Sequence, residues 1–387
     1  MEYYCTWVDV LQQIKSDTSI NFVARATTPW NAISIDALIL KLQALGIRVN
    51  AIIAIDEHPL AGFMIREKSF VNKVSCYCFL RCKKEKSTEE NRYINEQCMV
   101  NGFRHTAKVV FGNSSYDNIL YFATYNANTP DAILAVQYEF LKRKIVICRT
   151  EEGVGAYMGT FDKTYQGLRN ISTLGDLKGY ILTILLGKYV YRLFHKGYNS
   201  LTLKDSIRGL VVDESNLQYY LEVFQQQLSD LYICLDKDMI SKSVLVCTTA
   251  WRRDEIKDDE DFRILKQVCD ELHNRGFKLL LKTHPRDSYF KTRVDDLHCT
   301  HLEVENISME TIISCAKPLA MISFSSTTLV NAKIFGKVPV YCLSDMLDRS
   351  KISSFYLDEI DSFKRTFKHI VRFITSAEDI RFNEGIQ

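Results

Sequence analysis

The sequence predicts an α/β protein of two units, each a parallel sheet covered by helices. Short apolar runs alternate with segments of helical periodicity between residues 19 and 148, and the alternation returns between residues 243 and 335. The length of 387 residues agrees, because it exceeds what one hydrophobic core comfortably holds. A composition of 47% hydrophobic and 25% charged residues is that of a soluble globular protein.

The strands and helices follow from periodicity and from β-branched and aromatic content. In the first half, the predicted strands are 19–24, 48–55, 74–80, 107–112, 118–124 and 144–148, and the predicted helices are 31–45 and 130–141. In the second half, the predicted strands are 243–248, 277–282 and 319–323, and the predicted helices are 261–275 and 329–335. A less regular stretch separates the halves. We therefore expect a first domain over 1–165, a connecting region over 166–240 and a second domain over 241–387.

The charge and cysteine content exclude some classes of function. Basic and acidic side chains nearly cancel, 49 against 47, so the net charge of +2 gives no global field for nucleic acid. The 12 cysteines are scattered rather than framed in a short scaffold, which indicates reduced thiols. The group Cys76, Cys78 and Cys82 lacks a second pair or histidines at zinc spacing, so no metal site is predicted.

The N-terminal residues and the most apolar window bear on location. Residues 1–7 do not show a basic segment followed by an apolar stretch, so the cytoplasm is expected. Residues 179–194 are apolar but contain Lys188 and Arg192, and they are shorter than the ~20 residues of a membrane span. They predict a buried or amphipathic helix, with peripheral membrane attachment as the alternative.

Two adjacent carboxylates, Glu151 and Glu152, follow the predicted strand 144–148 and precede Gly153. Ligands collect at the carboxyl ends of parallel strands, so this position is a candidate site. Carboxylates that repel one another bind protons more readily, which suits one of them to proton abstraction. The alternative is an exposed acidic turn closed by glycine.

A second candidate segment reads Lys-Thr-His-Pro-Arg over 282–286, at the end of the predicted strand 277–282. Pro285 keeps the preceding residue extended, so the strand does not continue into a helix. An imidazole at His284, flanked by Lys282 and Arg286, suits a phosphate. The alternative is a structural histidine between solvated charges.

A third candidate segment, Phe-Ser-Ser-Thr-Thr over 324–328, directly precedes the predicted helix 329–335. The hydroxyls of Ser325 and Ser326, together with the amides of a helix N-terminus, make an anion site. Plain N-capping is the alternative, and the two roles are compatible. The acidic run 258–261 suggests a metal motif, but we interpret it as the start of the helix 261–275, where carboxylates favour the helix dipole.

In this order, the three segments resemble the shared signatures of the bacterial sialyltransferase families. Those signatures are an acidic pair before glycine, then His-Pro, then Ser-Ser/Thr. The segment 306–310 is similar to the one whose glutamate, here Glu310, holds the ribose hydroxyls of CMP in those enzymes. The segment 26–31 resembles the Arg-Thr-Pro start of the lipooligosaccharide sialyltransferase and polysialyltransferase families, although Ala26 and Thr27 separate Arg25 from Thr28-Pro29.

The resemblance implies a GT-B fold, in which two Rossmann-like domains face each other across a cleft. The first domain would bind a glycan acceptor and the second CMP-sialic acid. It implies an inverting transfer of sialic acid to a hydroxyl of a bacterial surface glycan (O-antigen, lipooligosaccharide or capsule), without a metal or other cofactor and without nucleic acid. The expected location is the cytoplasm, with peripheral association at the inner membrane as the alternative.

The resemblance also implies roles for individual residues. Glu151 or Glu152 would be the base, with Glu151 preferred. His284 would protonate or hydrogen-bond the CMP phosphate as it leaves. Arg25 and Asn31 would contact the acceptor. The residues expected at the donor are Thr248, Thr249, Lys282, Pro285, Glu310, Ser325 and Ser326.

Several alternatives remain open from the sequence. An enzyme that extends an α2,8-linked sialic acid polymer would carry a basic groove, for which the basic residues between 81 and 92 and at 142–144 are available. A related donor such as CMP-Kdo would use the same motifs. A non-catalytic protein that binds nucleotide sugars is disfavoured by the carboxylate pair and the strand-end histidine. A UDP- or GDP-sugar transferase is disfavoured because a glycine-rich donor loop is missing.

Overall fold

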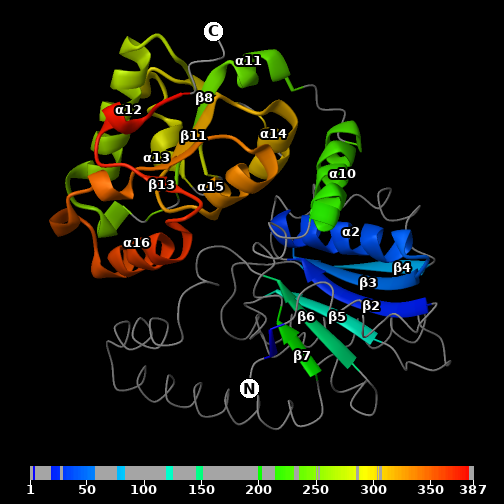
Figure 1. Cartoon of the computed structure of the whole chain (residues 1–387). Coiled ribbons are helices and arrows are strands. Elements are labelled where there is room, and N and C mark those ends of the chain that lie inside the picture. Colours follow the sequence, from blue (N-terminus) through cyan, green and yellow to red (C-terminus); the bar gives the residue numbers. More distant parts are fainter. Residues whose placement is uncertain are drawn as a thin grey trace, which may run out of the picture. The chain divides into compact units, whose positions relative to one another are not determined.

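The computed structural model describes residues 3–4, 19–26, 29–56, 76–82, 119–124, 145–150, 199–202, 214–230, 235–249, 251, 253–284, 287–302, 304 and 307–382. The chain divides into two compact units. The first comprises Met1–Glu152, Thr173–Tyr232 and Asn306–Ser308, and the second comprises Gly153–Ser172, Ile233–Glu305 and Met309–Gln387. Each unit is built on its own parallel sheet (Figure 1).

The first unit contains a 7-stranded sheet in the order β1-β7-β6-β5-β2-β3-β4. Every pair of neighbours in it is parallel. The strands are β1 (Tyr3–Tyr4), β2 (Ser19–Ala26), β3 (Arg48–Asp56), β4 (Cys76–Cys82), β5 (Ile119–Thr124), β6 (Ile145–Thr150) and β7 (Asn199–Thr202). The strands predicted at 19–24, 48–55, 74–80, 118–124 and 144–148 are confirmed. The predicted strand 107–112, the predicted helix 130–141 and the apolar window 179–194 lie outside the described residues.

Helix α2 (Pro29–Ala44) connects β2 to β3, and its ends follow from the sequence. Pro29 occupies the first helical position, where its missing N–H costs nothing. Gly46 ends the helix with φ +77°, a conformation that favours glycine, and the N–H of Ile47 donates to the carbonyl of Leu42 at 3.1 Å. The helix predicted at 31–45 is thereby confirmed.

Helix α10 (Glu214–Asp230) packs on α2, and the Trp30 and Tyr220 rings stack at 5.6 Å between centroids (Figure 1). Only a narrow stripe of α10, including Val223 and Phe224, is fully buried. A connecting region was expected here and this helix was not predicted, because its apolar stripe is narrow and its remaining residues are polar.

The second unit contains a 6-stranded parallel sheet in the order β10-β9-β8-β11-β12-β13. The strands are β8 (Ser243–Cys247), β9 (Lys278–Lys282), β10 (Thr300–His301), β11 (Ala320–Ser323), β12 (Val340–Cys342) and β13 (Arg372–Phe373). All residues of β8, β11 and β12 are buried, as in a sheet covered on both faces. The strands predicted at 243–248, 277–282 and 319–323 are confirmed.

The helices of the second unit are α11 (Lys237–Ser241), α12 (Glu260–Asn274), α13 (Ser288–Lys291), α14 (Met309–Ala316), α15 (Thr327–Asn331) and α16 (Ser354–Phe367). The predicted helix 261–275 corresponds to α12, which ends at Gly276 (φ +84°) just as α2 ends at Gly46. The predicted helix 329–335 corresponds to α15 and the π-helical turn Ala332–Gly336 that continues it. Among the described residues, no helix is both apolar and long enough to cross a bilayer.

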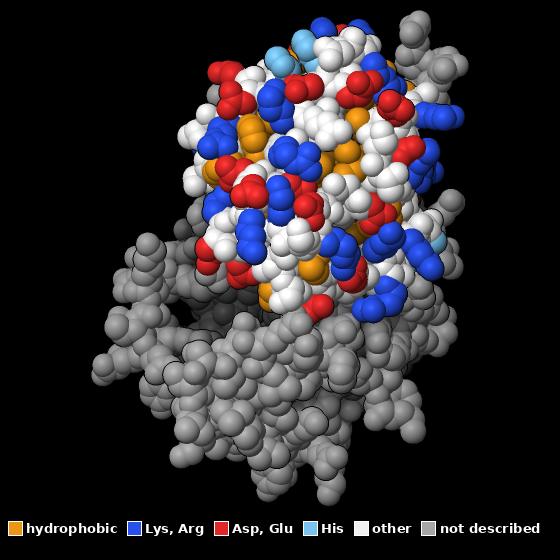
Figure 2. Space-filling model, turned by 90° about the vertical axis from the view of Figure 1, so that its left-hand side faces the viewer, with side chains coloured by type: hydrophobic (Ala, Val, Ile, Leu, Met, Phe, Trp, Pro, Cys, Tyr) orange, Lys and Arg blue, Asp and Glu red, His pale blue; other side chains and the backbone are white. Residues whose placement is uncertain are grey.

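The surface of the second unit carries charges of both signs. Figure 2 shows Lys and Arg side chains interspersed with Asp and Glu over one face of this unit. Cys247, Cys269, Cys299, Cys315 and Cys342 of the second unit are free thiols.

Candidate active site

The second and third candidate segments meet at one edge of the second sheet. His284 follows β9, Thr248 follows β8 and Ser325 follows β11. These strands are neighbours in the order β9-β8-β11 and run parallel, so their carboxyl ends lie at the same edge, with strands about 4.8 Å apart. Two segments separated by about 40 residues in sequence therefore lie on one narrow surface.

Hydrogen bonds fix the backbone at the ends of β8 and β9. The N–H of His284 donates to Thr248 Oγ1 at 2.9 Å, and the N–H of Thr248 donates to the carbonyl of Lys282 at 3.3 Å. Thr248 is 6% exposed and Thr249 is 9% exposed. Thr248 thus holds the His284 backbone in place from inside the edge. Pro285 lies outside the described residues.

The two serines of the third segment have different surroundings. Ser325 is buried, and its Oγ lies 2.9 Å from the Oγ of Ser344, which follows β12. Ser326 is half-buried and caps α15, because its Oγ accepts a hydrogen bond from the N–H of Thr328 at 3.3 Å. The Ser325 hydroxyl is therefore engaged within the protein, whereas Ser326 lies at the start of the helix, where N–H groups attract anions.

Two charged candidates, Lys282 and Glu310, lie near the end of β8. Lys282 Nζ donates to the carbonyl of Val304 at 2.8 Å, which joins β9 to the segment after β10. Glu310 lies in the first turn of α14 and accepts a hydrogen bond from Asn331 Nδ2 at 3.0 Å. Burial raises the pKa of the Cys247 thiol, an effect that Lys282 opposes and Glu310 reinforces. Cys247 is therefore a neutral thiol and not a nucleophile at this edge.

An aromatic cluster supports this edge from the interior. Trp251, just after β8, packs on Phe324 after β11 and on Tyr356 of α16, at 5.1 and 5.4 Å between ring centroids. Trp251 is 7% exposed and Phe324 is 1% exposed, so both rings belong to the core. They fix the spacing of the two strand ends.

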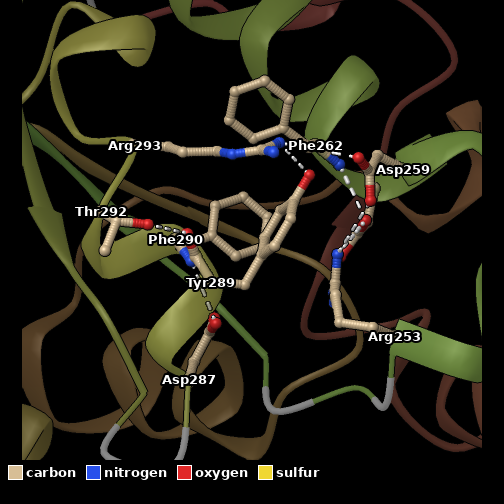
Figure 3. A network of polar contacts seen from close by, with 9 residues as sticks. Arg253, Asp259, Phe262, Asp287, Tyr289, Phe290, Thr292 and Arg293 are labelled. Atoms are coloured by element: carbon tan, nitrogen blue, oxygen red, sulfur yellow. Dashed lines mark hydrogen bonds and ion pairs between the residues drawn. The ribbon is translucent and has the colours of Figure 1, made fainter.

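A network of charged and aromatic groups braces the segments after β8 and β9 (Figure 3). The guanidinium groups of Arg253 and Arg293 lie 4.4 and 4.1 Å from the Tyr289 ring centroid. Arg253 binds the Asp261 carboxylate through both terminal nitrogens, and Arg293 lies 3.6 Å from Asp259. Burial, reinforced by a hydrogen bond to Asp259, raises the pKa of Tyr289 to about 12, so its hydroxyl stays protonated.

The network also refines the interpretation of the acidic run 258–261. Glu260 and Asp261 open α12, as predicted, but both are fully buried and both are paired with arginine. Helix-dipole stabilisation is thus accompanied by direct ion pairs. A buried carboxylate that loses its partner is strongly destabilising.

Replacement of Arg253 by leucine is expected to lower the free energy of unfolding by about 3 kcal/mol, because Asp261 would stay buried without its bidentate partner. Urea unfolding of the full chain measures this change. The control is Arg349→Leu, which breaks an exposed pair with Asp361 and should cost less than about 1 kcal/mol. Equal losses in the two variants would show that the Arg253 network does not brace the fold.

The first candidate segment directly follows β6 of the other sheet in the sequence. Strand β6 ends at Thr150, so the chain enters Glu151 from the carboxyl end of an internal strand, as predicted. Glu151 and Glu152 themselves lie outside the described residues. The assignment of one of them as the catalytic base remains a prediction.

The acceptor candidates lie at the carboxyl edge of the first sheet, where β6 also ends. Arg25 is in β2, and Asn31 is in the first turn of α2, which follows β2; only the backbone of both is described. Phe122 of β5 pairs with Ala24 of β2 and with Cys148 of β6. The carboxyl ends of β2 and β6 are therefore two strand spacings apart, roughly 10 Å.

Two residues that contact the candidates were not predicted from the sequence. Ser344 holds Ser325, and Asn331 holds Glu310. Ser344 follows β12, which was not predicted, and Asn331 was assigned only to the helix 329–335. Within the described part of the chain, no group of three His, Cys, Asp or Glu side chains is placed to hold a metal ion.

Two parallel-sheet units with polar candidates after their strands are the architecture of the GT-B fold class. The chain matches the model of the alpha-2,8-polysialyltransferase family (POLYST) over residues 84–344. That range covers well over half of the chain and contains all three candidate segments. The chain belongs to this family, and it is a sialyltransferase that uses CMP-sialic acid to sialylate glycans. The resemblance to bacterial sialyltransferases is confirmed.

Solved structures confirm the fold. An alpha/beta-galactoside alpha-2,3-sialyltransferase from Photobacterium phosphoreum superposes with a TM-score of 0.50 at 13% identity, over 94% of this chain and 100% of that one. A putative UDP-N-acetylglucosamine 2-epimerase from Listeria monocytogenes gives a TM-score of 0.50 at 11% identity, over 90% and 88%. The UDP-GlcNAc 2-epimerase from Methanocaldococcus jannaschii gives 0.50 at 12% identity, over 94% and 94%. No curated protein matches the chain.

Proposed function

We propose that this enzyme extends an α2,8-linked sialic acid polymer on a bacterial surface glycan. The observation that carries the proposal is the family match over 84–344, because the family is described by that activity. From the sequence, a single transfer was the first expectation and polymerisation the alternative, and the family match supports the alternative. The acceptor would then be the terminal sialic acid of the growing chain.

The proposed donor site is the carboxyl edge of the second sheet. The CMP phosphate would be bound by His284 and by the N-terminal amides of α15, the helix that Ser326 caps. Glu310 would accept hydrogen bonds from the ribose hydroxyls. The support for this assignment is that His284 and Ser326 follow strands β9 and β11, which flank β8, while Glu310 acts electrostatically on Cys247 at the end of β8. Ser325 would contribute through its backbone, because its hydroxyl is bonded to Ser344.

The proposed reaction is a single displacement with inversion. Glu151 or Glu152 accepts the proton of the acceptor hydroxyl, whose oxygen forms a bond to the anomeric carbon of sialic acid. The bond from that carbon to the phosphate oxygen breaks, and CMP leaves with the bonding electrons. His284 donates a hydrogen bond or proton to the departing phosphate, and the α15 amides stabilise its charge.

We further propose that the reaction needs no metal and that the enzyme works on the cytoplasmic face of the inner membrane. A single leaving phosphate can be neutralised by an imidazole and backbone amides. The apolar window 179–194, with Lys188 and Arg192, suits peripheral attachment. Co-sedimentation with anionic vesicles tests the attachment; protein that stays wholly in the supernatant would contradict it.

The function is tested by CMP release from CMP-sialic acid in the presence of EDTA. Lactose and oligosialic acid serve as alternative acceptors, and product length is measured by anion-exchange chromatography. We expect release with oligosialic acid and products longer than the acceptor by several residues. Release with lactose and a product one residue longer would instead establish a single-transfer enzyme, and release only after addition of Mg²⁺ would contradict the metal-free mechanism.

A further inference from the structure

Helices α14 and α15 of the second unit are linked by a hydrogen bond between two side chains. Asn331 Nδ2 donates to Glu310 Oε1 at 3.0 Å. Asn331 is 4% exposed, so the bond is shielded on the asparagine side, whereas Glu310 is half-buried. Within the described residues, the Glu310 carboxylate makes no other hydrogen bond. One carboxylate oxygen is thus fixed, and the other is left to accept from a ligand.

Close packing holds these two helices in a fixed register. Asn331 ends α15, and the π-helical turn Ala332–Gly336 continues against α14. A side chain at Gly336 would collide with Cγ2 of Ile313, so glycine there permits the close approach. Asn331 Oδ1 is buried without a hydrogen-bond partner, so the Glu310 bond is the contact that orients this amide. Buried polar atoms without a partner are rare in native proteins, so the burial of this amide calls for an explanation. Its Nδ2 hydrogen bond to Glu310 supplies one.

The placement of Asn331 connects two parts of the proposed donor site. The same short helix begins at Ser326, beside the proposed phosphate position, and ends at Asn331. Glu310 is close enough to the end of β8 to act electrostatically on Cys247. A shift of α15 would therefore move the phosphate-binding amides and the Glu310 carboxylate together.

We propose that Asn331 is a positioning residue of the donor site. Its amide orients the Glu310 carboxylate so that the second oxygen accepts from the ribose hydroxyls, and the pair makes the site selective for ribonucleotides over their deoxy analogues. This inference rests on the proposed function, because it takes Glu310 as the ribose ligand. A hydroxyl bonded to a carboxylate contributes enough to discriminate strongly against an analogue that lacks it.

The test compares the affinities of CMP and 2′,3′-dideoxy-CMP for the full chain, measured by isothermal titration calorimetry. The native protein is expected to prefer CMP by about 10- to 100-fold, as for hydrogen bonds to a charged group. Asn331→Asp places a second carboxylate beside Glu310 and removes the donor, and it should lower this preference about tenfold, with the dideoxy-CMP affinity unchanged. Asn331→Ala should behave in the same way if the aspartate variant does not fold.

A matched control is Ser314→Ala on α14, which removes a buried hydroxyl without a partner and should leave the preference unchanged. Glu310→Ala should abolish the preference, and Asn331→Asp added to it should cause no further change, because the two residues act as one unit. A full preference in Glu310→Ala would overturn the ribose role of Glu310 and with it this proposal. A preference lost in Glu310→Ala but retained in both Asn331 variants, or equal weakening of both nucleotides, would overturn the positioning role alone.

Discussion

Replacement of His284 by alanine is expected to lower kcat for sialyl transfer by about 10²- to 10³-fold, which is the usual loss when one preorganised donor to a developing negative charge is removed. Loss of the imidazole would leave the CMP phosphate without its hydrogen-bond donor. The backbone of the site should remain in place, because the bond to Thr248 Oγ1 comes from the His284 N–H and not from the ring. The measurement is CMP release under saturating donor and acceptor.

The control for His284 is His273→Ala. His273 is an exposed histidine in the last turn of α12, stacked on His298 at 4.7 Å between centroids. It should retain the native rate. A His284 variant with native kcat and native KM for the donor would remove the imidazole from the mechanism.

Replacement of Glu151 or Glu152 by glutamine is the second change with a large expected effect. The variant that removes the base should lose about 10²- to 10⁴-fold in kcat, the range that general base catalysis supplies. CMP affinity should be retained, since the base contacts the acceptor hydroxyl and not the nucleotide. Stopped assays of CMP release and calorimetric titration with CMP separate the two quantities.

Asp295→Asn, at an exposed carboxylate of the second unit, is the control for these variants and should keep the native rate. The two glutamine variants also decide which carboxylate is the base, because only one needs to lose turnover. Native turnover in both would refute the assignment of this pair.

The central strands of the fold could be predicted from the sequence because they are continuous apolar runs. Strands β8 and β11 are buried over their full length, which is the pattern that periodicity detects most readily. Strand β12 has only three residues and β13 only two, too few to show a pattern. Helix α10 was missed for a different reason: its buried stripe becomes evident only when α2 is present to cover it.

The candidate site could be predicted only in part. Strand order explains the successful part, because residues directly after adjacent parallel strands must lie at one edge, wherever they lie in the sequence. The partners of those residues depend on tertiary contacts between distant segments. Ser344 is 19 residues from Ser325, and Asn331 is 21 residues from Glu310, and neither separation carries a local signal. The sequence therefore indicated which candidate residues share the sheet edge but not the residues that hold them in place.

Hydrogen–deuterium exchange of the full chain with and without CMP tests whether CMP binds at the carboxyl edge of the second sheet. We expect slower exchange of backbone amides in peptides covering 248–251, 282–287, 307–310 and 324–328. Peptides covering 266–274 of α12, whose C-terminal end lies away from that edge, should show no change. Protection confined to other segments, or no protection at saturating CMP, would contradict binding at that edge.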